Sequence, residues 1–342
     1  DHECVTVEEA HQKLALGMFV FLREATSARN LRDLLPLINA HTNRRLCFCS
    51  DDRVPADLLD EGHIDSMLRT AIAEGVDPIV AIRMATLNPS EYFHLHDRGA
   101  IAPARLADLV VFSDLRAPRA EMVYRFGKLA AIDGQVIPWE RPRQPPVLRS
   151  SMNVDWRSIS FRVPAEGHHA RDIGVISDQI TTQHIVEEMP VCEGQVVSDP
   201  QRDLLKLAVL ERHMATGRVG LGFVRGLGLQ RGAIASTVAH DHHNIIVAGA
   251  DDRSMLTAVQ AVATTRGGIA TACEDKVLAQ VPLPIAGLMS DQPIEAVRRQ
   301  LDQVLEAACQ LGSPLRDPVM TLSFLALPVV PALKLTDRGL VD

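Results

Sequence analysis

Two short segments of the sequence carry side chains that could bind a metal ion. Asp1, His2 and Glu3 place an imidazole between two carboxylates, and a metal-binding imidazole is often held in one tautomer by such a neighbour. Asp51 and Asp52 directly follow a short apolar run, and adjacent carboxylates repel each other unless a cation or a donor compensates them. Each segment alone also fits an ordinary polar surface. The elements that position the two segments decide between these interpretations.

Alternating strands and helices are predicted over residues 1–92. Apolar runs predict strands at residues 18–22 and 45–49. Helical spacing of apolar residues recurs at residues 7–14, 31–38, 63–73 and 77–85. Such an alternation is typical of parallel strands, which deliver polar side chains at their carboxyl ends. Here these side chains are Arg23 and Glu24 after the first strand and Asp51 and Asp52 after the second.

A different pattern begins after residue 92. Short β runs bounded by Gly, Pro and Asp predict a small sheet with strands at residues 99–103, 107–112 and 123–129. Residues 139–150 contain several prolines and predict a stiffened linker. We therefore expect a small β domain with its linker over residues 93–150.

An α+β domain is predicted over residues 151–342. Its predicted strands are residues 219–224 and 244–249. Its predicted helices, amphipathic with charges opposite the apolar positions, are residues 204–213, 254–264 and 294–311. The fold class is thus α/β for the first part of the chain and α+β for the last.

Composition excludes several functional classes. The 342 residues carry a net charge of -8 and no basic run, which argues against nucleic-acid binding. Six scattered cysteines favour a reduced, cytoplasmic location. The apolar stretch at residues 322–333 contains prolines and is too short to span a membrane, and no signal peptide is recognisable. Because the chain opens on Asp1 and not on Met, we expect further sequence upstream.

The order of these motifs resembles the end of the catalytic barrel in the amidohydrolase superfamily. The resemblance rests on the aspartates at 51 and 52, the MATLNPS stretch at residues 84–90, and the Gly, Pro and Asp-Leu-Val pattern at residues 99–110. It implies the last strands and helices of an incomplete metal-dependent (β/α)8 barrel. It also implies that Asp51 binds metal and shuttles a proton to the leaving group, and that Asp52 accepts a hydrogen bond from a purine ring nitrogen.

A narrower resemblance is to the bacterial adenine deaminase family. It rests on five strings, which are residues 1–4 (DHEC), 49–53 (CSDDR), 61–65 (EGHID), 233–247 and 320–328. It implies hydrolysis of adenine to hypoxanthine and ammonia in purine salvage, by a hydroxide on a binuclear Mn or Fe centre, with Zn also suitable. His2 would be the metal ligand of the sixth barrel strand. Adenine would be the small-molecule partner, and a homodimer is expected.

Other residues carry two interpretations each. His240 and His243 belong to a His-rich run before an apolar strand, so they either line the active-site mouth or form an ordinary polar loop. Arg23 and Glu24 either orient the substrate or form an ion pair that braces the barrel rim.

The resemblance is incomplete, and this leaves three hypotheses. The family's first-strand His-x-His pair, bridging Glu and fifth-strand His have no counterpart in these residues. An adenine deaminase would need them from upstream sequence. A related hydrolase would prefer cyclic amides such as dihydropyrimidines or hydantoins, and an inactive fragment would bind no metal. The metal's identity, the oligomeric state and any second activity are not fixed by the sequence.

Overall fold

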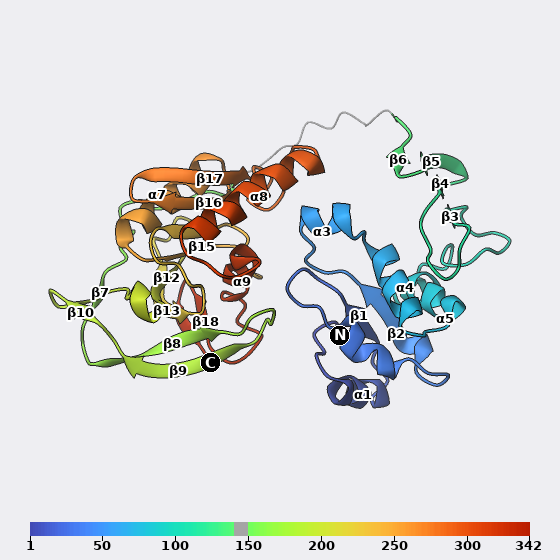
Figure 1. Ribbon diagram of the computed structural model, residues 1–342, viewed down its shortest axis with the longest axis horizontal. Coiled ribbons are helices and arrows are strands. Elements are labelled where there is room, and N and C mark those ends of the chain that lie inside the picture. The colour runs from blue at the N-terminus through green and yellow to red at the C-terminus, as the bar shows by residue number, and fades with distance from the viewer. Residues whose placement is uncertain (140–149) are drawn as a thin grey trace. The chain divides into compact units, whose positions relative to one another are not determined.

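The computed structural model describes residues 1–139 and 150–342 and separates into two compact units, Asp1–Pro145 and Pro146–Asp342 (Figure 1). Residues 140–149, which make up most of the predicted linker, lie outside the described residues. Each unit has its own sheets and its own buried apolar core.

The first unit begins with two parallel strands and their helices. Strands β1 (Val20–Arg23) and β2 (Leu46–Cys49) pair in register from Val20 opposite Leu46 to Arg23 opposite Cys49. Apolar side chains of both strands are fully buried against Met67 and Met84. The surrounding α-helices are α1 (Val7–Ala15), α2 (Leu31–Leu34), α3 (Pro55–Asp60), α4 (Ile64–Ala73), α5 (Pro78–Ala85) and α6 (Leu87–Tyr92). These confirm the predicted β/α alternation.

Local sequence explains where these helices begin and break. The carboxylate of Asp77 accepts hydrogen bonds from two backbone N–H groups in the first turn of α5, where Pro78 needs no donor. The single helix predicted at residues 31–38 is wrong. It divides into α2 and a 3-10 turn, Leu35–Leu37, because Pro36 lacks the N–H that would continue an α-helix. A second 3-10 turn, Asn43–Arg45, leads into β2.

A four-stranded antiparallel sheet completes the first unit. Its order is β3 (Leu109–Val111), β4 (Met122–Arg125), β5 (Lys128–Ile132) and β6 (Gln135–Val136). The strand predicted at residues 99–103 is wrong, because this stretch is irregular. The strand predicted at residues 123–129 is a hairpin, since Phe126 and Gly127 both adopt positive φ and turn the chain.

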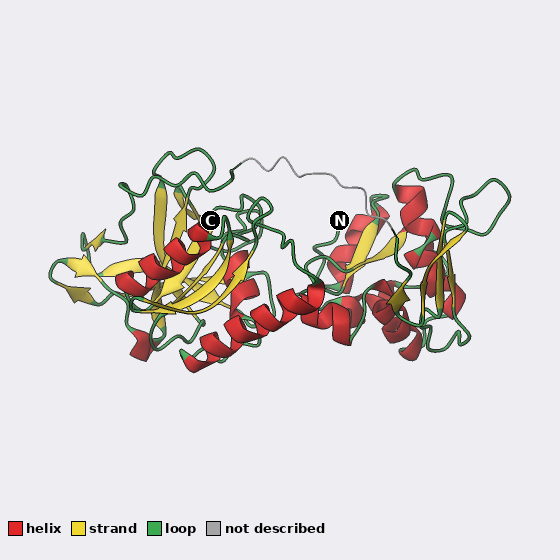
Figure 2. Ribbon diagram, turned by 90° about the horizontal axis from the view of Figure 1, so that it is seen from above, coloured by secondary structure: helices red, strands yellow, loops and turns green. Residues whose placement is uncertain are grey.

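The second unit contains an eight-stranded sheet, visible as one curved sheet with helices alongside it in Figure 2. Its spatial order is β17-β16-β14-β15-β12-β13-β8-β9. The strands of this sheet are β8 (His169–Val175), β9 (Thr182–Glu188), β12 (Leu204–Leu210), β13 (Val219–Arg225), β14 (Ala233–Ser236), β15 (Ile245–Gly249), β16 (Gly268–Cys273) and β17 (Lys276–Pro282). Helix α7 (Asp252–Thr264) buries Met255, Val259 and Val262 against it.

Shorter elements surround this sheet. The remaining helices are α8 (Ile294–Gln310), α9 (Pro318–Phe324) and the 3-10 turn Pro200–Arg202. The remaining strands form two small sheets, comprising β7 (Val163–Pro164), β10 (Val191–Cys192) and β11 (Gln195–Val196), and β18 (Lys334–Thr336) with β19 (Gly339–Val341).

One predicted helix of the second unit is a strand. Residues 204–213 were expected to be helical, whereas Leu204–Leu210 form β12 between β13 and β15. All seven residues of β12 are buried. A strand buried on both faces lacks the alternation of apolar and polar residues that identifies a strand in sequence, so its apolar run resembles a helix face. The predicted helices at 254–264 and 294–311 are confirmed as α7 and α8.

Candidate metal and substrate site

The carboxyl ends of β1 and β2 bring the predicted metal-binding segments together. Arg23 ends β1 opposite Cys49, the last residue of β2, so Asp51 lies two residues beyond this edge. Asp1 lies along the other side of β1, because its amine donates to the Phe19 carbonyl at 2.9 Å and its carbonyl accepts from the Phe21 amide at 2.8 Å. The two bonds reach the residues on either side of Val20, which is the hydrogen-bond pattern of parallel strands. The backbone of Asp1 therefore runs parallel to β1. His2 therefore emerges at the same edge as Asp51.

Three potential ligands meet at this edge. The His2 Nε2 atom lies 3.2 Å from Glu3 Oε1 and 3.9 Å from Asp51 Oδ2. One ligand atom from each of the three residues falls within 4.8 Å of the others. We call His2, Glu3 and Asp51 the edge cluster. One imidazole and two carboxylates suit zinc, iron or manganese, so the donor chemistry of the edge cluster fits the metal that the sequence implies.

Sequence reasoning selected two of the three members. His2 and Asp51 were predicted as ligands, whereas Glu3 was noted only as a flanking carboxylate. The signal that could have identified Glu3 was its adjacency to His2. Asp51 adopts a left-handed backbone conformation, with φ of 52°, directly after β2. Such a conformation is uncommon for a residue other than Gly and often marks a functional turn.

Arg23 is the buried counter-ion of the edge cluster. Its side chain is only 2% exposed, and Nη1 lies 2.9 Å from Asp51 Oδ2 and 3.1 Å from Glu3 Oε2. Its Nε and Nη2 atoms are buried and have no hydrogen-bond partner among the described residues. One guanidinium thus compensates two carboxylates that would otherwise repel each other.

Glu24 and Asp52, the residues that follow Arg23 and Asp51 in the chain, contact residues outside the edge cluster. The Glu24 carboxylate accepts from the Leu31 amide at 3.3 Å and lies 3.9 Å from Arg29, and burial raises its pKa. These partners do not belong to the edge cluster. The carbonyl of Asp52 accepts from the Thr26 amide at 2.9 Å, which ties the loop after β2 to the loop after β1.

Two contacts that sequence reasoning missed support the Asp51 loop. Thr26 donates its hydroxyl proton to Asp57 at 2.7 Å and accepts from the Val54 amide at 2.9 Å. His63, from the EGHID string, places Nε2 2.6 Å from the hydroxyl of Ser50, the residue before Asp51. Both contacts hold the backbone on either side of the aspartate, so they position it without touching the edge cluster.

A cavity of about 430 Å³ opens beside the edge cluster. Its lining combines polar residues of the cluster with aromatic rings, and comprises Asp1, His2, Phe21, Phe48, Cys49, Asp51, Pro89, Tyr92 and Phe93. Tyr92 packs edge-on against Phe21 and Phe93, with ring centroids 5.0 and 4.7 Å apart. Burial raises the pKa of the Cys49 thiol to about 12, so this thiol stays protonated at neutral pH.

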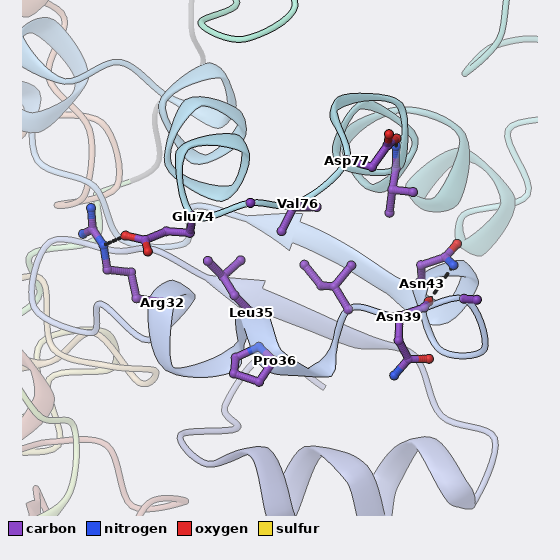
Figure 3. Close-up of a pocket in the computed structure, with 12 residues that line it drawn as sticks. Arg32, Leu35, Pro36, Asn39, Asn43, Glu74, Val76 and Asp77 are labelled. Atoms are coloured by element: carbon purple, nitrogen blue, oxygen red, sulfur yellow. Dashed lines mark hydrogen bonds and ion pairs between the residues drawn. The ribbon is translucent and has the colours of Figure 1, made fainter.

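A larger hollow of about 600 Å³ lies elsewhere in the first unit (Figure 3). It is lined by the turn after α2 and by the connection between α4 and α5, and an ion pair between Arg32 and Glu74 spans 2.9 Å at its side. The residues around Asn43 lead into the amino end of β2, whereas the edge cluster lies at the carboxyl ends of β1 and β2. None of the three cluster residues lines this hollow, so size alone does not identify the site.

The predicted substrate-binding histidines lie in the second unit. The rings of His240 and His243 are 5.7 Å apart, and His240 stacks on Phe324 at 4.9 Å. Arg212, fully buried, donates to the His243 carbonyl at 2.5 Å and to the carbonyls of Ser151 and Ala286. Burial is the main cause of a lowered pKa of His243. The loop is therefore fixed by buried hydrogen bonds.

Each unit is similar to a known protein family. Residues 4–136 match the amidohydrolase family, and residues 179–342 match the adenine deaminase C-terminal domain. Proteins of the amidohydrolase family generally depend on divalent metal ions. In the part of the chain that the structure describes, no helix is both long and apolar enough to cross a membrane.

Curated relatives match along the whole chain. An adenine deaminase of Desulfatibacillum aliphaticivorans is 53% identical over 342 residues, and adenine deaminase 2 of Carboxydothermus hydrogenoformans is 44% identical over 344. An adenine deaminase of Methanothrix thermoacetophila is 46% identical over 349 residues. Each match covers 100% of this chain, which spans 60% of the length of each of these relatives. The chain is thus similar along its whole length to part of each of these adenine deaminases.

Proposed function

We propose that the protein catalyses the hydrolysis of adenine to hypoxanthine and ammonia, as a step of purine salvage. The observation that carries this proposal is the meeting of His2, Glu3 and Asp51 within 4.8 Å at the carboxyl edge of two parallel strands. The names of the curated relatives supply the substrate. Water adds at C6 of the purine, and the 6-amino group leaves as ammonia after it gains a proton.

His2 and Asp51 would hold the metal, and Glu3 offers a third ligand atom. When bound, a divalent metal supplies a hydroxide from water at neutral pH. We propose a binuclear centre of manganese or iron, with zinc also suited to the same donors. The remaining ligands, which are a His-x-His pair, a bridging Glu and a further His, would come from sequence that precedes this chain in the whole protein.

Asp51 would also move the proton during the reaction. Its carboxylate can accept a proton from the attacking water and return it to the departing amine. Arg23 orients this carboxylate, since its Nη1 lies 2.9 Å away. This contact supports the bracing role considered for Arg23 from the sequence. The alternative is that Arg23 or Glu24 contacts the substrate and orients it.

Recognition of the base would involve polar and aromatic groups. We place Asp52 at a ring nitrogen of the purine, where its carboxylate accepts a hydrogen bond. Phe21, Tyr92 and Phe93 line the cavity beside the edge cluster and offer ring faces or edges to a planar base. We also propose His240 and His243 as substrate-binding residues.

The proposed domain organisation follows the two families. Residues 1–92 would form the end of the amidohydrolase barrel, residues 93–150 a small β domain with its linker, and residues 151–342 the C-terminal domain. We propose a cytoplasmic homodimer. The edge cluster would act only within a barrel that the preceding sequence completes.

The test is adenine turnover by the full-length protein that includes the preceding region. Ammonia release should be measured with adenine, and ring opening to the N-carbamoyl acid, which releases no ammonia, should be measured with dihydrouracil and hydantoin. Elemental analysis for Mn, Fe and Zn should accompany both assays. We expect activity with adenine alone and metal in the purified protein. The Asp51→Asn variant controls for contaminating activity. Metal-loaded protein that hydrolyses hydantoin but not adenine would overturn the proposal, and a folded protein with no metal would favour a non-catalytic chain.

A further inference from the structure

Residues 1–5, which carry two of the three members of the edge cluster, form no helix or strand. Their backbone meets β1 only through the two hydrogen bonds of Asp1 described above, so β1 does not by itself fix the residues that follow Asp1. The placement of His2 and Glu3 therefore depends on contacts between this segment and other elements of the first unit. Helix α1 supplies these contacts.

The Asp1 carboxylate holds the backbone around His2. Its Oδ1 accepts from the Glu3 amide at 2.6 Å, which closes a turn with His2 as the middle residue. Its Oδ2 accepts from Lys13 Nζ of α1 at 2.8 Å. Because Lys13 bonds the second oxygen of the same carboxylate, it fixes the rotation of the Asp1 side chain. The turn that carries His2 is thereby fastened to α1.

The same ammonium also fastens the far end of the segment. Lys13 Nζ lies 2.5 Å from Glu9 Oε1, and Glu9 Oε2 accepts from the Val5 amide at 3.3 Å. Glu9 and Lys13 are four residues apart on α1, so their side chains lie on the same side of the helix. Glu9 is itself held, since its amide donates to the Thr6 hydroxyl at 3.3 Å. Bonds thus run from Asp1 through Lys13 and Glu9 to Val5.

We propose that Lys13 is a positioning residue that clamps residues 1–5 to α1 and so directs His2 and Glu3 toward Asp51. This inference rests on the proposed function, in which the edge cluster holds the metal. Lys13 is not a ligand, because an ammonium group offers no lone pair to a cation. It acts on the metal site only through the backbone that carries two of the ligands.

The sign of the change in metal affinity distinguishes this role from a simple effect of charge. Removing a positive charge near a cation site favours cation binding, because it removes a Coulomb repulsion. Removing a clamp weakens binding, because groups that orient metal ligands contribute about 10 to 100-fold to metal affinity or activity. Replacing Lys13 by Met therefore gives opposite results under the two interpretations.

Metal affinity is tested by calorimetric titration of the metal-free full-length protein with Mn²⁺. We expect the Kd to rise about 10-fold in Lys13→Met and to stay near the unmodified value in Lys13→Arg, which keeps a cation between the two carboxylates. Gln12→Met is the matched control, since Gln12 lies on the same helix and bonds Glu8 at an exposed position. Unchanged or tighter Mn²⁺ binding in Lys13→Met would overturn the proposal.

Hydrogen–deuterium exchange tests the clamp without metal. The amides of Glu3 and Val5 donate to the two carboxylates that Lys13 joins, so residues 1–5 should exchange faster in metal-free Lys13→Met than in Gln12→Met. Unchanged exchange of residues 1–5 would overturn the proposal. Equal acceleration in β1 and β2 would also overturn it, because this would be a general loss of stability.

Kinetics complete the test in the full-length enzyme. Lys13 does not line the cavity beside the edge cluster, so at saturating Mn²⁺ the Lys13→Met variant should lose about 10-fold in kcat for adenine with little change in KM. A raised KM with unchanged kcat would contradict a role through the metal ligands. Faster exchange of residues 1–5 in a protein that binds no Mn²⁺ or does not deaminate adenine would overturn only the proposed function.

Discussion

The Arg23 guanidinium lies 2.9 Å from the Asp51 carboxylate across the carboxyl ends of two parallel strands. The same Nη1 atom reaches Glu3 at 3.1 Å, so a single buried cation compensates two carboxylates of the edge cluster. Glu3 and Asp51 keep 37% and 27% of their side chains exposed, so they remain open to a metal ion or to solvent. Arg23 therefore stabilises the folded arrangement of both carboxylates.

Replacing Arg23 by Met should destabilise the first unit by about 1 to 3 kcal/mol, because two neighbouring carboxylates lose their counter-ion while keeping some solvent. Added Mn²⁺ should recover part of this loss by binding the folded state. Urea denaturation with and without Mn²⁺ measures both effects. Arg32→Met is the matched control, since Arg32 and Glu74 form an exposed pair and the expected loss is below about 1 kcal/mol. Equal losses in the two variants would contradict the assigned role of Arg23.

Asp51→Asn and Asp52→Asn should have different kinetic effects in the full-length enzyme. Asp51→Asn removes the proton shuttle, so kcat should fall about 10³-fold. Asp52→Asn should mainly affect recognition of the ring, lowering kcat/KM for adenine by about 10 to 100-fold. Steady-state ammonia release measures both parameters. A kcat for Asp51→Asn within about twofold of the unmodified enzyme would exclude its proposed role.

His243→Ala tests whether the C-terminal domain takes part in catalysis. Loss of its N–H should lower kcat/KM for adenine in the full-length enzyme by about 10-fold or more. His184→Ala is a suitable control, because His184 lies in β9 and its ion-pair partner is the surface residue Asp342. Unchanged adenine turnover in His243→Ala would show that the His-rich loop is an ordinary polar loop.

Gly220→Ala should strongly destabilise the second unit, whereas Gly222→Ala should be tolerated. Both glycines belong to β13, but a Cβ on Gly220 would collide with the backbone carbonyl of Thr336. A Cβ on Gly222 would meet the Leu335 side chain at 3.4 Å, an ordinary contact distance. We expect losses of about 3 kcal/mol and below about 1 kcal/mol, respectively, in urea denaturation. A loss of stability in Gly220→Ala as small as that in Gly222→Ala would show that β18 moves away from Gly220 at little cost in free energy.

Asp172→Asn should change the pH dependence of stability. Burial and the neighbouring Glu187 raise the pKa of Asp172 to about 7, although Arg225 lies 3.8 Å away. A folded-state pKa above that of the unfolded chain gives stability that is full below about pH 4 and declines as the pH rises to about 7. The variant cannot ionise, so it should lose less stability than the unmodified protein between about pH 5 and pH 8.

Thermal unfolding at about pH 5 and about pH 8 measures how much stability Asp172→Asn and the unmodified protein each lose across this range. Arg202 and Arg225 both bond to Glu187, so these ion pairs should persist in the variant. Asp342→Asn serves as the control, because Asp342 is exposed and pairs with Arg171 and His184 at the surface. Identical pH profiles for Asp172→Asn and the unmodified protein would contradict the raised pKa.

Most of the local structure near the site could be predicted from the sequence. Apolar runs identified β1 and β2, and helical spacing identified α1, α4 and α5, because half-buried elements show their periodicity in sequence. The errors have physical causes. Central strand β12 is buried on both faces and lacks alternation, and Pro36 breaks a helix whose apolar spacing continues past it.

The sequence by itself determined which side chains are available for chemistry, since His2 stands out between two carboxylates, and Asp51 and Asp52 by their place after an apolar run. Only the tertiary structure decided which of them meet. Parallel pairing of β1 with β2 and with the Asp1 backbone brings Glu3 into the cluster and buries Arg23 beneath it. Glu24, one residue further on, bonds instead to the Leu31 amide. Successive side chains of a strand point to opposite faces, so proximity in sequence cannot separate these two roles.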